Sequence, residues 1–168
     1  EIYRLIALGL DIEQASGGAF SWSLRPILDS YGFTGQHAYR LPTAAEFAAW
    51  RQLPDDRAIR LESDGHSVTT APNLRLELAS LGDGYAADLA AEALKRSGIR
   101  EGLVNASGEV VGFGERTWQI AIRHPRGQGY LTVLPIKNRC VSTSGDYERF
   151  FMVGARRYCH ILDPRNGI

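Results

Sequence analysis

Two polar segments near the carboxyl end contain residue types that can bind an anion. Residues 142–147 (STSGDY) supply several hydroxyls, with Ser144 and Gly145 at the centre of a flexible turn. One hairpin later, His160 and Ile161 precede an Asp-Pro pair, which favours a turn. A single histidine on an apolar strand is usually structural. His160 is therefore a site candidate only if the fold brings it close to those hydroxyls.

A glycine-rich junction is a second candidate anion site. Glu77, Ser80 and Asp83 lie where an expected strand over residues 74–78 meets an expected helix over residues 85–97. Such a junction directs backbone N–H groups and the positive helix end at an anion, and its glycines let a phosphate approach the main chain. The spacing is not that of a Walker or Rossmann loop. A purely structural turn is therefore an equally good interpretation of this segment.

Composition argues against several classes of partner and chemistry. Nineteen basic and nineteen acidic residues balance, so no broad field favours a nucleic acid, and no apolar run reaches the ~20 residues of a membrane span. Cys140 and Cys159 allow one disulfide or none. His37, His66 and His124 have no partner at metal-ligand spacing. The chain also lacks a Gly-x-Ser-x-Gly elbow and a clear general acid/base pair.

The elements that must position these residues predict an α+β fold. Thr43 and Glu46 have the spacing of a capping box, which predicts a helix running through Trp50. Helices are also expected over residues 2–16, 26–31 and 85–97, and strands over 58–62, 66–69, 74–78, 102–106, 109–113, 118–123, 130–136 and 140–143. Helices followed by a run of strands predict one domain over residues 1–168, with an antiparallel sheet and packed helices. Residues 105–109 are interpreted as an ordinary hairpin turn.

Four segments, taken in order, resemble the ApbE family, the FAD:protein FMN transferases. They are residues 17–21 (GGAFS) with Pro26 and residues 31–33, residues 81–88 (LGDGYAAD), residues 103–108 (LVNASG), and residues 142–147 followed by 160–164 (HILDP). Each segment is moderately specific, and their common order makes the resemblance strong. It implies an ApbE-like (T-fold-like) domain that uses Mg²⁺ to cleave FAD and attach FMN to a Thr or Ser of an acceptor flavoprotein. It also implies a periplasmic or inner-membrane-associated location, with the cytoplasm as the alternative.

The resemblance assigns site residues one by one, while the catalytic group stays unassigned. The implied FAD contacts are Ala19, Phe20, Ser21, Glu77, Asp83, Ser144, Gly145, His160 and Ile161, and the implied metal contact is Ser80. Three of these positions depart from the family pattern. Ser21 and Glu77 stand where the family commonly has Asp, and Asp83 replaces a Glu or Lys.

The resemblance also implies that the chain is the central portion of the family domain, incomplete at both ends. We expect the Asp and Thr that complete the magnesium site to lie in a family segment beyond Ile168. Two other functions stay open. The departures at Ser21, Glu77 and Asp83 would suit a non-catalytic FAD-binding or degenerate family member. An FAD pyrophosphatase that releases FMN and AMP is the other.

Overall fold

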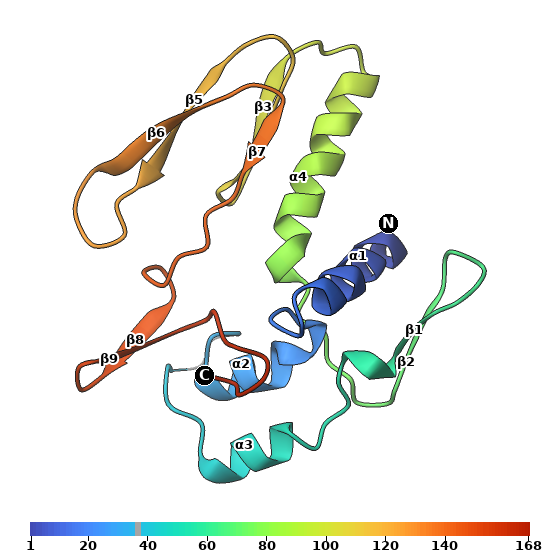
Figure 1. Ribbon diagram of the computed structural model, residues 1–168, viewed down its shortest axis with the longest axis vertical. Helices are drawn as coiled ribbons and strands as arrows, with labels where there is room; N and C mark the ends of the chain where they lie inside the picture. The colour runs from blue at the N-terminus through green and yellow to red at the C-terminus, as the bar shows by residue number, and fades with distance from the viewer. Residues whose placement is uncertain (36–37) are drawn as a thin grey trace. The chain divides into compact units, whose positions relative to one another are not determined.

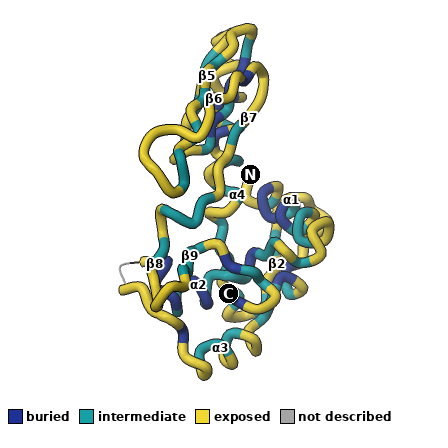
Figure 2. Tube along the Cα trace, turned by 60° about the vertical axis from the view of Figure 1, so that its left-hand side comes forward, coloured by how far each residue is buried: buried dark blue, intermediate teal, exposed yellow. Residues whose placement is uncertain are grey.

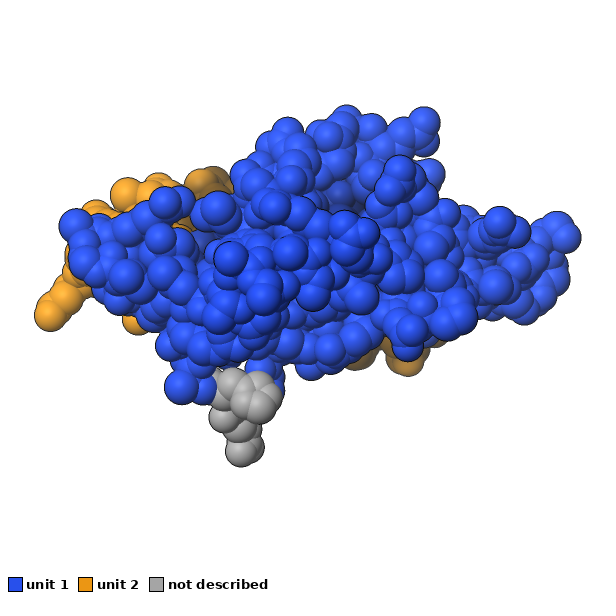
Figure 3. All heavy atoms as spheres, turned by 90° about the horizontal axis from the view of Figure 1, so that it is seen from below, with its two compact units in different colours: residues 1–78, 148–168 blue, residues 79–147 orange. Residues whose placement is uncertain are grey.

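A computed structural model describes residues 1–35 and 38–168, so His37 lies outside the described residues. The chain divides into two compact units, which Figure 3 colours separately. Unit 1 contains residues 1–78 and 148–168, and unit 2 contains residues 79–147. The expected single domain stays a prediction.

In its described residues, unit 1 is built from three helices, two short 3₁₀ turns and two hairpins (Figure 1). The elements are α1 (Ile2–Ala15), a 3₁₀ turn (Trp22–Leu24), α2 (Arg25–Tyr31), α3 (Ala44–Trp50), a 3₁₀ turn (Asp56–Ala58), β1 (Ile59–Leu61), β2 (Val68–Thr70), β8 (Phe150–Val153) and β9 (Arg156–Cys159). Both hairpins are antiparallel. The first three predicted helices and the β1–β2 hairpin are confirmed, with their ends within two residues of the predicted ones.

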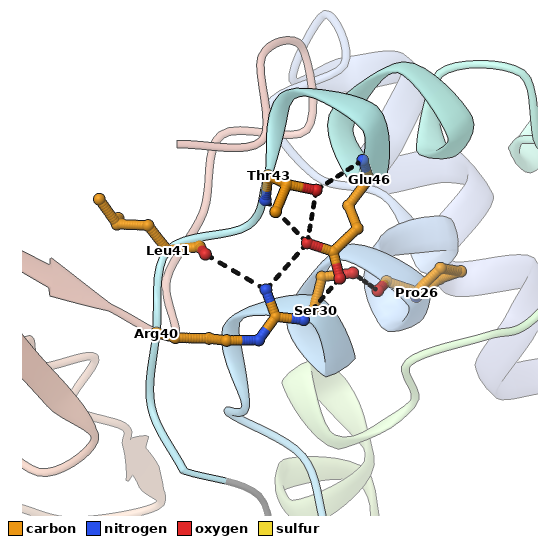
Figure 4. A network of polar contacts seen from close by, with 6 residues as sticks. All are labelled: Pro26, Ser30, Arg40, Leu41, Thr43 and Glu46. Carbon is orange, nitrogen blue, oxygen red and sulfur yellow. Dashed lines mark hydrogen bonds and ion pairs between the residues drawn. The ribbon is translucent and has the colours of Figure 1, made fainter.

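The predicted capping box of α3 is confirmed (Figure 4). Thr43 Oγ1 accepts a hydrogen bond from the Glu46 amide at 3.2 Å, and the Glu46 carboxylate accepts one from the Thr43 amide at 2.7 Å. Arg40 adds a two-pronged ion pair to the same carboxylate, at 2.8 and 2.5 Å. The hydrogen bond from Arg40, followed by those from Thr43, lowers the pKa of Glu46 to about 2.

The core of unit 1 is aromatic and draws on both of its chain segments. Figure 2 colours the chain by how far each residue is buried. The buried residues of this core are Ile27, Leu28, Tyr31, Phe33 and Leu162, and the partly buried residues packed against them are Leu24, Phe47, Trp50, Phe151 and Tyr158. The rings of Phe151 and Tyr158 stack with centroids 5.5 Å apart. Burial of large aromatic side chains is the main stabilising contribution at such a site. Residues 148–168 therefore complete a core that α2 begins.

Unit 2 consists of one long helix and two small antiparallel sheets. The elements are α4 (Ala79–Arg96), β3 (Gly102–Ala106), β4 (Glu109–Phe113), β5 (Trp118–Arg123), β6 (Tyr130–Ile136) and β7 (Arg139–Val141). One sheet has the order β3-β4-β7, and β5 pairs with β6. Helix α4 packs against β3 and β4. The expected turn between β3 and β4 is confirmed, with Gly108 at φ 103° and its amide bonded to Asn105 Oδ1.

The structure corrects the predicted strand-to-helix junction. Residues 74–78 form no strand, and α4 begins at Ala79, so Gly82 and Gly84 lie inside a helix. Neither glycine has a positive φ, and an added Cβ would meet nothing within 4 Å at either position. The prediction failed because two glycines cost a helix only about 1 kcal/mol each, which the rest of an 18-residue helix can offset. The α+β class is confirmed, with the described strands forming four small sheets.

Candidate functional site

A cavity of about 320 Å³ opens within unit 1. Its lining residues are Glu13, Gly18, Phe20, Ser21, Ser23, Trp50, Arg51, Leu53, Pro54, Asp55, Asp56, Arg57, Pro164 and Arg165. Two of the predicted FAD contacts, Phe20 and Ser21, are among them. The volume is at the small end of the range for ligand sites, enough for one ring system. The cavity therefore brings the residue 17–21 segment together with the end of the 160–164 segment.

The buried Trp22 holds this wall of the cavity in place. Its side chain is fully buried, and its backbone N–H donates a 2.7 Å hydrogen bond to Asp56 Oδ2. The Glu77 amide donates to the Trp22 carbonyl at 2.7 Å, and the indole N–H donates to the Ile6 carbonyl at 3.2 Å. The ring of Phe20 meets the indole edge to face, with centroids 5.0 Å apart. Ser21, which precedes Trp22, and Glu77, which bonds to its carbonyl, are thus both held next to one anchored residue although they are far apart in sequence.

Ser21 is the starting point of a short chain of hydrogen bonds. Its hydroxyl donates to Asp56 Oδ1 at 3.2 Å and lies 2.8 Å from the hydroxyl of Ser23. The Ser23 amide also donates to Ser21 Oγ at 3.0 Å, which caps the 3₁₀ turn. A carboxylate therefore contacts position 21 after all, although Asp56 contributes it from another part of the chain.

Glu77 belongs to a charged network around Asp29. Arg25 Nε donates to Asp29 at 2.8 Å, and Arg25 Nη1 lies 3.7 Å from Glu77 Oε2. Arg75 forms a 2.5 Å ion pair with Asp29, and Thr34 donates its hydroxyl to the same carboxylate. Desolvation by itself would raise the pKa of Asp29, but the bonds from Thr34, Arg25 and Arg75 outweigh it and lower that pKa. The network keeps the segment around Glu77 close to α2.

His160 and Ile161 lie beside the aromatic core of unit 1. The imidazole ring of His160 meets Phe33 with centroids 6.4 Å apart, and Nδ1 lies 3.4 Å from the Arg149 carbonyl oxygen. Desolvation lowers the pKa of His160, so the ring is neutral at pH 7. A carbonyl oxygen only accepts, so Nδ1 carries the proton and Nε2 is an acceptor. Ile161 is 49% exposed.

The other predicted site residues, apart from Ala19, belong to unit 2. Ser80 and Asp83 are exposed on the first turns of α4. Ala19, in unit 1, is exposed as well. Ser144 is exposed, while Gly145 lies so close to the Tyr147 ring that an added Cβ would clash with it.

Residues 142–147 have no regular secondary structure, and Asp146 of this segment forms an ion pair with Arg126. The guanidinium of Arg126 donates hydrogen bonds of 2.8 and 2.6 Å to the carboxylate of Asp146. The guanidinium of Arg123 lies 5.7 Å from the centre of the Tyr147 ring. The hydroxyls of this segment belong to unit 2, and His160 belongs to unit 1. The condition that the sequence set for His160, closeness to those hydroxyls, stays a prediction.

Within residues 1–35 and 38–168, no three His, Cys, Asp or Glu side chains gather closely enough to hold a metal ion. Magnesium prefers several oxygen ligands including carboxylates, so the Ser80 hydroxyl does not form such a site alone. The described residues therefore do not fit a magnesium ion. Cys140 and Cys159 are both free thiols. None of the helices in the described part of the chain is long and apolar enough to span a bilayer.

The order of motifs along both units matches one family throughout. A model of the ApbE family matches residues 1–168, the whole chain. The chain belongs to the ApbE family. This result confirms the resemblance inferred from the four sequence segments.

Curated ApbE relatives and solved ApbE structures agree with that membership. The chain is 30% identical to an FAD:protein FMN transferase of Klebsiella pneumoniae (99% of this chain, 52% of the relative) and 33% identical to one of Rhodobacter capsulatus (96% and 32%). It matches the apo flavinyl transferase ApbE of Pseudomonas stutzeri at TM-score 0.85 and 34% identity (99% and 53%). It matches the ApbE protein of Thermotoga maritima at TM-score 0.87 and 31% identity (99% and 56%). The chain thus spans about half, or less, of the length of these relatives.

Sequence reasoning missed the carboxylate of Asp56 and the partners of Glu77. Asp56 is 6% exposed and contacts residues 34 and 35 positions earlier in the chain. The only local signal was a pair of acidic residues, Asp55 and Asp56, after a proline, which is typical of a helix start. Arg25 and Asp29 have the i, i+4 spacing of a helical ion pair. That spacing could have indicated the network around Glu77.

Proposed function

We propose that this chain is part of an FAD:protein FMN transferase and that the unit 1 cavity holds part of FAD. The observation that carries the proposal is the match to the ApbE family over the whole chain. The cavity supports it, because two residues implied to contact FAD, Phe20 and Ser21, line a space of suitable size.

In the proposed reaction, a Thr or Ser hydroxyl of an acceptor protein attacks the phosphorus of the FMN half of FAD. The bond from that phosphorus to the bridging oxygen breaks, AMP leaves with the electron pair, and the hydroxyl proton is lost to solvent or a base. FMN is then joined to the acceptor by a phosphoester bond. No residue of this chain is assigned as the base.

This chain's contribution to the reaction is to bind and orient FAD. The Phe20 ring forms an apolar wall on which a flat ring can stack, since aromatic rings prefer offset or edge contacts at such distances. Arg51 and Arg165 also line the cavity and can attract a phosphate, although Arg165 already bonds to Asp163 at 2.7 Å. Neutral His160 can accept a hydrogen bond through Nε2.

Dependence on Mg²⁺ is part of the proposal, in line with the family resemblance. A divalent ion would neutralise the diphosphate and polarise its phosphorus–oxygen bonds. The described residues do not fit the ion, so no step is derived through it. A periplasmic or inner-membrane-associated location is likewise proposed from the family resemblance alone.

The test is isothermal titration of the chain with FAD, with and without Mg²⁺. FAD binding that Phe20→Ala weakens at least tenfold, and that the exposed control Tyr130→Ala leaves unchanged, is the expected result. Absence of FAD binding under both conditions would refute the proposed FAD site. Incubation with an acceptor protein, followed by mass spectrometry, then tests the transfer of FMN.

A non-catalytic FAD-binding role is the second candidate. It is favoured by Ser21, which stands where the family commonly has an Asp. Product analysis separates the candidates. A transferase gives FMN-modified acceptor and AMP, a pyrophosphatase gives free FMN and AMP, and a binding protein returns FAD intact.

A further inference from the structure

The carboxylate of Asp56 is a buried charge that forms part of the cavity wall. It is 6% exposed and receives two hydrogen bonds, from the Trp22 amide at 2.7 Å and the Ser21 hydroxyl at 3.2 Å. A carboxylate in such a position only accepts hydrogen bonds. The Ser21 hydroxyl must therefore point its hydrogen at Asp56.

That constraint passes along the chain of hydroxyls to Ser23. A hydroxyl has one hydrogen and two lone pairs. With its hydrogen given to Asp56, Ser21 Oγ accepts from the Ser23 amide at 3.0 Å and from the Ser23 hydroxyl at 2.8 Å. The hydrogen of Ser23 is therefore used inside the wall, and only its lone pairs are left for a ligand.

We infer that Asp56 sets the hydrogen-bonding direction of this wall, so that the cavity selects a ligand group that donates N–H or O–H at Ser23. An oxygen of a phosphate is a poor fit there, because it carries no hydrogen and is repelled by the buried carboxylate. If the ligand is FAD, which rests on the proposed function, the group at Ser23 is a ring N–H or a hydroxyl of the ribityl chain. The diphosphate then lies elsewhere.

An amide side chain at position 56 reverses the direction of the hydrogen bonds along Ser21 and Ser23. In Asp56→Asn the side-chain oxygen accepts from the Trp22 amide, and the side-chain NH₂ donates to Ser21. The Ser21 hydrogen then turns to Ser23, and the Ser23 hydrogen turns to the cavity. Shape and volume stay nearly constant while the preferred ligand group changes from donor to acceptor.

The experiment compares two flavin-like rings that differ in donors. Lumichrome has two ring N–H groups, and 1,3-dimethyllumichrome has none. Dissociation constants are measured by NMR titration for the unmodified chain, Asp56→Asn and Ser23→Ala. The control is Asp55→Asn, which alters a neighbouring carboxylate that lines the same cavity but bonds to Arg57. The indole N–H signal of Trp22 reports that each variant is folded.

The unmodified chain and Asp55→Asn should bind lumichrome about five- to tenfold more tightly than the dimethyl compound, the factor that one neutral hydrogen bond contributes. Asp56→Asn and Ser23→Ala should bring that ratio to about one or below. Methyl bulk is the same for every variant, so a change in ratio reports donor selection. An unchanged ratio in folded Asp56→Asn, or no binding of either ring to the unmodified chain, would overturn the inference.

A parallel titration with FAD separates this inference from the proposed function. A ratio that responds to Asp56→Asn in a chain that binds no FAD supports the inference and counts against the proposed function. FAD binding together with a constant ratio supports the proposed function and overturns the inference.

Discussion

Replacing Gly9 by alanine should destabilise unit 1, although alanine is the better helix former. Gly9 is a buried position of α1 that faces the indole of Trp22. A Cβ at this position would lie well under 3.0 Å from the Cε2 and Cζ2 atoms of that ring. The ring is fully buried and bonded to Ile6, so it cannot move aside without cost.

The magnitudes decide the sign of the effect. Alanine in place of glycine inside a helix gains about 1 kcal/mol. Forcing a methyl group into a filled site costs about 2–3 kcal/mol, and displacing the indole from the Ile6 carbonyl costs about 1 kcal/mol more. The net expectation for Gly9→Ala is a loss of about 2–3 kcal/mol in the free energy of unfolding.

Urea unfolding followed by tryptophan fluorescence measures this loss. The matched control is Gly84→Ala in α4, where an added Cβ meets nothing within 4 Å and the helix should gain about 0.5–1 kcal/mol. A Gly9→Ala protein as stable as the unmodified chain would refute the packing of α1 on Trp22. Equal effects of the two substitutions would do the same.

The remaining predictions concern a cap, a histidine and an ion pair. Thr43→Ala should lower the free energy of unfolding by about 1 kcal/mol. The lowered pKa of Glu46, about 2, means that its ionised form contributes stability that is lost as pH falls from 4.5 to 2. Glu46→Gln should therefore make the free energy of unfolding fall less steeply over that pH range. The NMR titration midpoint of His160 should lie below 6.5, because burial lowers its pKa. The free energy of unfolding should then decrease as pH falls from 6.5 towards that midpoint, since the unfolded chain takes up the proton first. His160→Phe should lack this pH dependence. Arg126→Ala should speed amide exchange in residues 142–147 with little change in global stability, since the ion pair is largely exposed.

Each of these three has a result that would contradict it. For the cap, an unchanged pH profile in Glu46→Gln would show that Arg40 and Thr43 do not hold the ionised form. A His160 midpoint above 6.5 would mean that a nearby negative charge outweighs burial. Amide exchange that is as slow in Arg126→Ala as in the unmodified chain would mean that other contacts order the segment.

Local chemistry made much of the fold predictable. The capping box of Thr43 and Glu46 predicts where α3 begins, because its two partners are only three residues apart in the sequence. The turn at Gly108 is similarly local. The start of α4 was mispredicted because Gly82 and Gly84 are typical of turns, and no short window shows that residues 79–96 gain enough from helix packing to include them.

The candidate site was less predictable because it depends on long-range contacts. Phe20 and Ser21 were named from a family resemblance, but the neighbours that define their chemistry come from elsewhere. Asp56 reaches Ser21 only after the chain has passed through α2 and α3. Neither periodicity nor local spacing carries information about such a pair. The hydrogen-bond direction at Ser23 depends on three side chains at once, so it can be inferred only from the three-dimensional structure.

The division of the chain has a consequence for synthesis on the ribosome. Unit 2 is continuous, whereas unit 1 is interrupted after residue 78 and resumes at residue 148. The 69 residues of unit 2 (147 − 79 + 1) take roughly 3–14 seconds to translate. Throughout that interval Tyr31 and Phe33 lack Phe151, Tyr158 and Leu162 as packing partners. The segment of unit 1 that precedes unit 2 can therefore complete its core only after unit 2 has been translated, and its aromatic residues are the surface that a nascent-chain chaperone would meet during that interval.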